Sequence, residues 1–387
     1  MMKISLAVVA YNEEKYLPRL LSDVEKQTYP HEDIEIVLID SASTDGTKRV
    51  MEEFALKYDL TGSRSKDDLA GKPVNHDLTH ERSGVSTFSK QDSFYNIAIF
   101  ENKKKRLACG CNIAIREFTT DALVRVDAHA RIPADFIEGC VKGLDKEYVT
   151  GGARPTVCKS NDPWSRMLWM AEESLFGSSI SSARRVTDEE DKKRRDEGSD
   201  HKKDEHEYVN SIFHPCCRRE VLEKIGGFRE DLGRTEDNEF YYRLRENGYR
   251  IYRSPDIYSE QYIRPSLKKM LKQKAGNGYW IGRTLGIVPG CISPYHLVPF
   301  GFVSAIIASV TLAFKGKPQF LRALIAAYGP VAILMAVWSA YTLRRSGGKP
   351  PAFSILLPVV FFMLHICYGV GTVAGIISIP FGRKNDK

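Results

Sequence analysis

Four short acidic signatures are spread over the first two-thirds of this chain, and they constrain its fold more than any other feature. They are Ala10-Tyr-Asn-Glu-Glu14, Asp40-Ser-Ala-Ser-Thr-Asp-Gly46, Asp127-Ala-His129 and Thr235-Glu-Asp237. Each of the first three follows a short apolar run rich in β-forming residues. In an α/β protein, side chains just beyond the carboxyl ends of parallel strands face the crevice where ligands bind. The set therefore predicts a nucleotide and metal site at one edge of a sheet, with a separate catalytic base.

The segments around these signatures alternate between strand and helix patterns. Ile4 to Ala10 and Ile34 to Ile39 are continuous apolar runs, as in buried parallel strands. Glu13 to Gln27 carries apolar residues at helical spacing, and Asp45 to Tyr58 is predicted as a second helix. This β-α-β-α start predicts an α/β fold with a mostly parallel, Rossmann-like sheet and flanking helices. Further strands are predicted over 93–100, 122–126, 148–155 and 208–215, and further helices over 107–118, 133–144, 218–225 and 236–247.

Two segments interrupt this pattern. Residues 61–92 show no periodicity and are rich in Ser, Asp, His and Gly, so we expect a long irregular insertion. Residues 184–207 are nearly all charged, with both signs. Such a segment is more often solvated or disordered, and the alternative is a lid that orders when a donor binds.

The C-terminal part of the chain is strongly apolar. The segments 297–314, 320–343 and 353–381 are each long enough, or nearly so, to cross a bilayer as a helix. A basic amphipathic helix is predicted just before them, over 266–285, where it can rest on the membrane surface. The alternative is a hydrophobic hairpin in the interface. The predicted organisation is a globular domain over 1–265, an interfacial segment over 266–296, a membrane region with two to three transmembrane helices over 297–381 and a basic tail over 382–387.

Charge and cysteine usage narrow the classes of function. The net charge is +7, with Lys and Arg clusters beside the apolar segments, which favours anionic lipid and an anionic substrate. Since no basic stripe is interleaved with aromatic residues, we expect no nucleic-acid partner. The eight Cys lack the paired C-x-x-C spacing of a zinc site and are expected to be free thiols in a reducing compartment. Residues 1–10 are too short for a secretory signal and are predicted as a strand.

The first two signatures suit a nucleotide. The Asp40 carboxylate can accept a hydrogen bond from a uracil N–H or a ribose hydroxyl. Asn12 and Glu13, on the turn after the first strand, can shape the same pocket. The structural alternative is helix capping by Ser43 or Thr44, and we expect capping and binding to coexist.

The third and fourth signatures suit metal binding and acid–base chemistry. Asp127 and His129 lie on one loop after a strand, and one carboxylate with one imidazole can hold Mn²⁺ or Mg²⁺ when a diphosphate supplies the other ligands. Taken alone, His129 could be an ordinary polar loop residue. Glu236 and Asp237 open a predicted helix, where a carboxylate can deprotonate an acceptor hydroxyl. The alternative for this pair is that the acidic groups complement the helix dipole.

Together these motifs resemble those of the family 2 inverting glycosyltransferases with the GT-A fold, over roughly residues 3–285. The carrying motifs are the Tyr-Asn-Glu-Glu start, the Asp40 to Gly46 run, Val124-Arg-Val-Asp-Ala-His-Ala130 and Thr235-Glu-Asp-Asn-Glu-Phe-Tyr-Tyr-Arg-Leu-Arg245, in that order. Val126-Asp-Ala-His129 and the Tyr-Arg-Leu-Arg continuation are most similar to the succinoglycan-type bacterial glucosyltransferases, which extend polyprenyl-diphosphate-linked sugars.

The resemblance implies a role for each motif. Nucleotide contacts are expected from Ala10, Asn12, Glu13, Asp40 and Asp127, metal and diphosphate contacts from Asp127 and His129, and catalysis from Asp237 with Glu236 beside it. The usual D-x-D of the family is D-x-H in this chain. The QxxRW signature of processive synthases is missing, which favours transfer of a single sugar.

The sequence thus predicts a metal-dependent, membrane-anchored inverting glycosyltransferase. It would transfer one hexose, glucose, from a UDP-sugar to a polyprenyl-diphosphate-linked saccharide in exopolysaccharide or cell-surface glycan synthesis. The predicted location is the inner membrane, as a multi-pass protein whose catalytic domain is cytoplasmic. The rivals are a processive polysaccharide synthase and a catalytically silent sugar-nucleotide-binding scaffold. A Rossmann dehydrogenase is disfavoured because no G-x-G-x-x-G follows the first strand.

Overall fold

The computed structural model describes residues 1–58, 93–158, 160–177, 208–262, 266–345 and 347–382. The expected insertions at 61–92 and 184–207, and the tail from 383 onward, lie outside the described residues. The chain divides into two compact units. The first comprises residues 1–155, 182–236 and 240–261, and the second comprises 156–181, 237–239 and 262–387.

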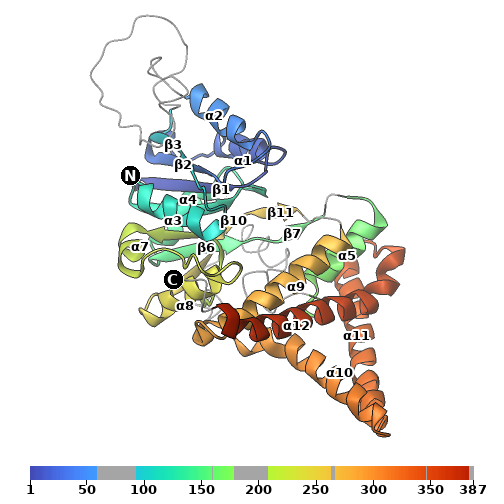
Figure 1. Cartoon of the computed structure of the whole chain (residues 1–387). Coiled ribbons are helices and arrows are strands. Elements are labelled where there is room, and N and C mark those ends of the chain that lie inside the picture. The colour runs from blue at the N-terminus through green and yellow to red at the C-terminus, as the bar shows by residue number, and fades with distance from the viewer. Residues whose placement is uncertain (59–92, 159, 178–207, 263–265, 346, 383–387) are drawn as a thin grey trace, which may run out of the picture. The chain divides into compact units, whose positions relative to one another are not determined.

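A central sheet organises the first unit (Figure 1). Over the described residues it has eight strands in the order β3-β2-β1-β4-β9-β6-β10-β8. The first four strands in this order are mutually parallel, and β6 is parallel to β10, whereas β9 is antiparallel to both of its neighbours. The prediction of an α/β fold is confirmed. The strands are β1 (Ile4–Ala10), β2 (Ile34–Asp40), β3 (Asn96–Glu101), β4 (Ala122–Asp127), β6 (Val149–Ala153), β8 (Tyr208–Val209), β9 (Phe213–Arg218) and β10 (Ile251–Tyr258).

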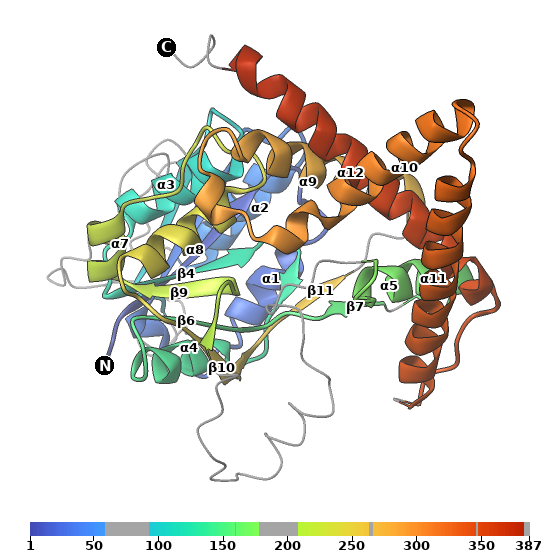
Figure 2. The same cartoon turned by 90° about the horizontal axis from the view of Figure 1, so that it is seen from below.

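Helices cover both faces of this sheet (Figure 2). Side chains alternate along each strand, so Leu6 and Val8 of β1 pack in one apolar cluster while Ala7 packs in the other. Burial of these two layers supplies the main stabilisation, at roughly 25 cal/mol per Å² of apolar surface. The helices on the first face are α1 (Leu17–Val24), α2 (Thr47–Lys57) and α4 (Phe136–Leu144); those on the second are α3 (Leu107–Glu117), α7 (Arg219–Ile225) and α8 (Glu236–Glu246).

The predicted strand over 208–215 is wrong in its bounds. The structure has the short β8 there, and the main strand, β9, begins at Phe213 and runs on to Arg218. His214 takes a left-handed conformation with φ 48°, which is uncommon for any residue other than glycine. The strand β10 was not predicted at all. Its pairing with β6 shifts register between Arg253 and Tyr258, around Pro255, as expected where a proline removes a ladder donor.

The cysteines are free thiols, as expected. Six of them are buried, and Cys158 and Cys367 are partly exposed. Burial raises the pKa of Cys217 above its ordinary value, which keeps this thiol protonated and unreactive.

The second unit is helical. The predicted basic helix is present as α9. The helix α5, which comes earlier in the chain, also belongs to this unit together with the C-terminal helices. Among the residues that the structure describes, three helical stretches are long and apolar enough to cross a membrane: 294–314, 319–345 and 352–380. The helices are α5 (Pro163–Glu173), α9 (Leu267–Thr284), α10 (Val298–Phe314), α11 (Gln319–Arg345) and α12 (Leu357–Gly382).

Candidate active site

The loops that follow β1 and β2 are bound to each other at the carboxyl edge of the sheet. Asn12 and Ala42, one in each loop, both take left-handed backbone conformations, with φ 55° and 52°. The Asn12 side-chain oxygen accepts a hydrogen bond from the backbone N–H of Thr44 at 2.8 Å, and the Asn12 N–H donates to Ser43 Oγ at 3.1 Å. Non-glycine residues at positive φ are uncommon and cluster at functional sites. The two loops therefore form one shaped surface, and the Asn12 side chain is one of the groups that connect them.

Asp40 is fixed at the end of β2. Only 3% of the residue is exposed, and both carboxylate oxygens lie 3.3 Å from the backbone N–H of Ser43, which donates to them. Its carbonyl accepts a hydrogen bond from the Asn102 N–H at 2.7 Å. A carboxylate accepts several hydrogen bonds at once, so this geometry suits binding of an N–H or hydroxyl donor at the strand end.

The expected helix cap by Ser43 or Thr44 is not formed. The helix α2 begins at Thr47, with Gly46 before it, and the Asp45 carboxylate accepts hydrogen bonds from the Thr47 N–H at 3.0 Å and the Thr47 hydroxyl at 2.5 Å. Burial alone would raise the pKa of Asp45, but these hydrogen bonds lower it below the ordinary value. Ser43 and Thr44 instead bind Asn12, because the left-handed residue Ala42 turns the loop toward β1.

Asp127, at the end of β4, is held by two buried side chains. Its Oδ2 lies 3.2 Å from Arg154 Nη1 and 3.5 Å from His214 Nε2, and its backbone N–H donates to His214 Nε2 at 3.3 Å. His214 Nδ1 is 2.9 Å from Ser259 Oγ. The Arg154 guanidinium lies 3.7 Å from the centre of the Phe213 ring, so it is held from both sides.

The charges of this cluster fix the protonation of its members. Burial by itself would raise the pKa of Asp127, but the neighbouring His214 side chain and the positive charges of Arg154 and Arg125 hold it well below the ordinary value. Burial lowers the pKa of His214, and the nearby Asp127 only partly opposes this. At neutral pH the cluster therefore contains an ionised carboxylate, a cationic guanidinium and a neutral imidazole.

His129 connects the β4 loop to the β1 loop. Its Nδ1 lies 3.3 Å from Glu13 Oε1, and its Nε2 lies 3.2 Å from the Gln261 side-chain nitrogen. Two short strands set this position, because Ala130 of β5 (Ala130–Arg131) pairs with Gln261 of β11 (Glu260–Tyr262). The structure thus brings Glu13 and His129 together, as the sequence predicts for residues of one site.

The donor set fits a hard divalent ion. Within the described residues no group of three or more His, Cys, Asp and Glu side chains forms a closed metal cage. The pairs that are present are Glu13 with the imidazole of His129 and Asp127 with the imidazole of His214. Oxygen and imidazole ligands suit Mg²⁺ and Mn²⁺, and an ion held by few protein groups relies on substrate phosphates for the rest.

Glu236 and Asp237 occupy the first turn of α8. Glu236 is buried, and the helix is anchored further along by Phe240 and Leu244, which lie in the apolar cluster on the second face of the sheet. Asp237 and Glu239 group with the second unit, whereas Glu236 groups with the first. The predicted position of Asp237 at a helix start is therefore correct, and its catalytic role stays a prediction.

Sequence reasoning missed Arg154 and His214, which contact Asp127, and Ser259, which contacts His214. The Gly151-Gly152 pair just before Arg154 was an available signal. A Cβ on Gly152 would come within 1.8 Å of the Ile257 carbonyl oxygen, so β6 and β10 approach closely there. The residue types around His214 and Ser259 in the sequence do not predict that these two side chains contact each other at the edge of the sheet.

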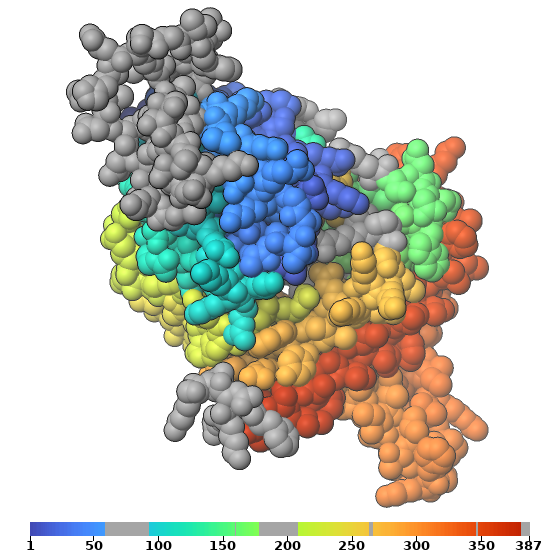
Figure 3. Space-filling model, turned by 45° about the horizontal axis from the view of Figure 1, so that its top comes forward, coloured from blue at the N-terminus to red at the C-terminus, as the bar shows by residue number. Residues whose placement is uncertain are grey.

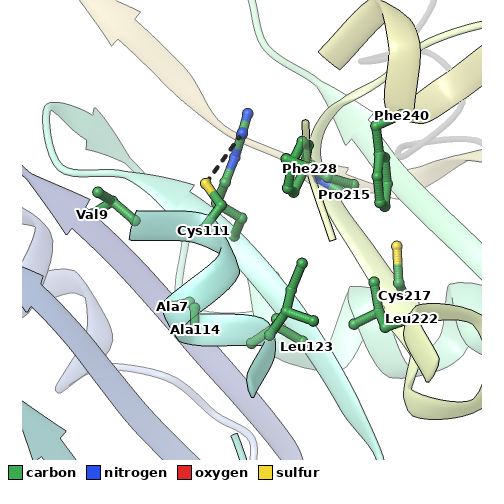
Figure 4. Close-up of a pocket in the computed structure, with 12 residues that line it drawn as sticks. Ala7, Val9, Cys111, Ala114, Leu123, Pro215, Cys217, Leu222, Phe228 and Phe240 are labelled. Carbon is green, nitrogen blue, oxygen red and sulfur yellow. Dashed lines mark hydrogen bonds between the residues drawn. The ribbon is translucent and has the colours of Figure 1, made fainter. Parts of the chain in front are cut away.

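A small apolar cavity lies elsewhere, on the face of the sheet under α3, α7 and α8 (Figure 4). Its volume is about 20 Å³, and Val9, Leu123, Phe228 and Phe240 are among the side chains around it. The Arg125 guanidinium donates to Cys111 Sγ at 3.7 Å at its margin. This cavity is a packing gap in the core, distinct from the polar loops at the strand ends.

The family of the chain follows from comparison with known proteins. The family described as Glycosyl transferase family 2 matches residues 5–66 and 83–226, which include Asn12, Asp40 and Asp127. The chain belongs to glycosyl transferase family 2. A solved structure agrees in fold: the mannosyltransferase PcManGT from Pyrobaculum calidifontis, in complex with GDP-Man and Mn²⁺, superposes with a TM-score of 0.50 at 18% identity, over 95% of this chain and 87% of that one. The prediction of a GT-A fold is confirmed.

The sequences of two curated relatives align with most of the length of this family 2 glycosyltransferase. One is the dolichyl N-acetyl-alpha-D-glucosaminyl phosphate 3-beta-D-2,3-diacetamido-2,3-dideoxy-beta-D-glucuronosyltransferase of Methanococcus voltae, 23% identical over 97% of both chains. The other is the succinoglycan biosynthesis protein ExoA of Rhizobium meliloti, 23% identical over 71% of this chain and 76% of its own length. The resemblance to the succinoglycan-type proteins is therefore confirmed.

Proposed function

We propose that this chain is a membrane-anchored inverting glycosyltransferase that transfers one hexose, glucose, from a UDP-sugar to a hydroxyl group of a lipid-linked saccharide. The main support for the proposal is that the loops at the ends of three strands converge in a chain that belongs to family 2. Asp40 ends β2, Asp127 ends β4, and the contact of Glu13 with His129 ties the β1 loop to the β4 loop. The lipid-linked acceptor is supported by the dolichyl phosphate named in one relative and the succinoglycan biosynthesis named in the other.

In this proposal the donor is bound by the loops at the strand ends. Asp40 accepts a hydrogen bond from the uracil N–H or a ribose hydroxyl, while Ala10, Asn12 and Glu13 shape the pocket wall. Asn12 does so by fixing the β2 loop rather than by direct contact, since its side-chain oxygen already accepts from Thr44. The donor diphosphate meets Asp127, His129 and the positive charge of Arg154.

Asp127 and His129 are the residues that would hold Mg²⁺ or Mn²⁺. The ion, when bound, would neutralise charge on the diphosphate as it leaves. Arg154 adds a fixed positive charge beside Asp127, at 3.2 Å. This arrangement keeps the site from being strongly anionic before the donor arrives, so we expect the free protein to bind metal weakly.

Asp237 is the proposed general base, with Glu236 next to it. Its carboxylate takes the proton of the acceptor hydroxyl as that oxygen forms a bond to the anomeric carbon. The bond from that carbon to the diphosphate breaks on the opposite face, and its electron pair leaves with UDP. Attack from the face opposite the leaving group inverts the configuration of the sugar.

A panel of labelled sugar nucleotides tests this function. Membranes that contain the protein are incubated with labelled UDP-glucose, UDP-N-acetylglucosamine and GDP-mannose, and the lipids are then extracted. Transfer of label from UDP-glucose into the lipid fraction is expected, and it should fall to background in the Asp40→Ala variant. Label that enters the lipid fraction only from GDP-mannose would contradict the donor assignment, and absence of lipid label with every donor would contradict the acceptor.

A further inference from the structure

Two helices of the second unit, α9 and α12, touch each other through their backbones. Gly278 and Gly282 on α9 each face α12, where a Cβ would lie 1.9 Å from the Tyr368 carbonyl oxygen and 2.2 Å from that of Thr372. In turn, Gly371 and Gly375 on α12 face α9. A Cβ at these positions would lie 2.2 Å from the Ala275 carbonyl oxygen and 2.0 Å from the Tyr279 carbonyl oxygen, respectively. Small residues four apart on both partners let helices approach this closely. We call these four glycines the glycine seam.

The seam fixes how α12 runs. Successive contacts pair Ala275 with Gly371, Tyr279 with Gly375, and Gly286 with Ile379, so the two helices run in the same direction. Figure 3 shows them as two bands in contact along their length. The last turns of α12 therefore lie beside the end of α9, immediately before the chain enters α10.

The start of α12 is anchored near α5. The Phe353 ring, just before α12, packs edge-on against Trp164 of α5 with 5.8 Å between ring centres. Leu357 and Phe361 of α12 lie in one buried cluster with Met167 and Leu168 of α5. Both ends of α12 are thus seated on α5 and α9, segments that precede the first apolar helix in the chain.

The helix α9 is unsuited to the hydrocarbon interior of a bilayer. It carries Lys268, Lys269, Lys272, Lys274 and Arg283, and no acidic residue. The first three of these lysines are exposed, and Lys274 lies 4.0 Å from Glu172 of α5. Charged side chains in the interior of a bilayer are costly, whereas lysines at its surface meet anionic headgroups.

The helices α10 and α11 differ from α9 in this respect. They expose large apolar side chains along their length, including Ile307, Leu334 and Trp338. In Figures 1 and 2 they form a hairpin that projects away from the α9–α12 pair. Their surfaces match lipid, whereas α12, which also exposes Val359, Val370 and Ile377, shares its length with a charged helix.

We propose that α12 does not cross the membrane, although it is long and apolar enough to do so, but lies with α9 at the bilayer surface on the side where α9 begins. The exposed lysines of α9 then face anionic lipid headgroups, and only the α10–α11 hairpin enters the hydrocarbon. This inference rests on the membrane anchoring in the proposed function and not on the sugar transferred. It places the basic residues Arg383, Lys384 and Lys387 on the same side as α9, as the positive-inside rule favours.

Cysteine labelling of the full-length protein tests this topology without any need for activity. Lys317→Cys, at the exposed turn between α10 and α11, and Lys387→Cys, at the end of the chain, are each treated with a membrane-impermeant maleimide, with the unsubstituted protein as background. In intact cells Lys317→Cys should be labelled, and Lys387→Cys should react only after permeabilisation. Labelling of Lys387→Cys in intact cells would overturn the proposal. Failure of membrane anchoring itself would show separately, as protein in the soluble fraction.

A pair of glycine variants tests whether the glycine seam holds α12 in place. In the Lys387→Cys background, Gly375→Leu should push α12 off α9 and raise the labelled fraction in intact cells several-fold. Gly301→Leu is the matched control, because no atom lies within 4 Å of a Cβ at that position on α10. Equal, unchanged labelling in both variants would refute the role of the seam. A rise confined to Gly375→Leu would support it.

Discussion

At the scale of single residues, the side chains that matter are those at the ends of β1, β2 and β4. The residue types and their order could be predicted from the sequence. A carboxylate that follows an apolar strand is seldom needed for folding, so its occurrence after three strands indicates a shared site. Their partners were not readable. Arg154, just after β6, and His214, on β9, reach Asp127, and Ser259, just after β10, contacts His214. Such contacts depend on strand order, which local pattern does not encode.

The first prediction concerns the proposed base. Asp237→Asn should leave donor binding near normal and lower turnover by about 10²-fold or more, since it removes only the group that takes the acceptor proton. Glu246→Gln, at the other end of the same helix, is the control for general effects on α8. Titration of donor binding and a turnover assay measure the two quantities. Turnover close to that of the unsubstituted protein would remove Asp237 from the mechanism.

The second prediction concerns the divalent ion. Activity should be lost in EDTA and restored by Mn²⁺ or Mg²⁺, and His129→Ala should require a higher metal concentration for half-maximal activity. The reason is the small number of protein ligands, which leaves the diphosphate to supply the others. Metal titrations with and without nucleotide measure this. Full activity in EDTA would contradict the metal requirement, and an unchanged titration in His129→Ala would exclude that residue alone.

The third prediction concerns Arg154, whose side chain is 7% exposed and is paired with Asp127. Arg154→Met should weaken UDP-sugar binding by about 10- to 100-fold, which corresponds to loss of a hydrogen bond to a charged group. Arg154→Lys should recover part of this affinity because it keeps the charge. Arg116→Met is the control, since Arg116 is exposed and bound to Glu117. Calorimetric titration with the donor decides the point, and unaltered affinity in Arg154→Met would place the residue outside the site.

At the scale of elements, sequence periodicity located most helices and strands within a few residues. Ile4–Ala10 and the basic helix over 267–284 were predicted almost as they are found. The errors occurred in β9 and β10, where a left-handed His214 and the internal Pro255 break the alternation on which a strand prediction depends. These strands are positioned by their neighbours β4 and β6, and such tertiary pairing can override local preference.

The fourth prediction tests how closely β6 approaches β10. Gly152→Ala should destabilise the protein by about 1–3 kcal/mol, because its Cβ would meet the backbone oxygen of Ile257, and backbone cannot move aside as a side chain can. Gly329→Ala, in open surroundings on α11, should be neutral or mildly stabilising. Thermal unfolding in detergent compares the two variants. An unchanged melting temperature for Gly152→Ala would show that the strands can separate without loss of stability.

At the scale of the whole molecule, composition alone separated a polar globular part from an apolar C-terminal part. The family assignment and the three apolar helices agree with that division. Hydropathy could not show that α12 lies along a charged helix. The glycine spacing of α12 predicts close approach of another helix, but it does not identify which helix that is. The same limit applies to the sugar and the acceptor, which depend on pocket shape more than on the signatures at the strand ends.

The most direct test of the account is the product itself. Membranes with the protein are supplied with UDP-α-glucose carrying ¹³C at the anomeric carbon, the lipids are extracted, and the anomeric signal is read by NMR. The account predicts ¹³C-glucose in the lipid fraction with the β configuration, because attack opposite the diphosphate inverts that carbon. An α-linked product, or label confined to free glucose and UDP-glucose, would contradict it.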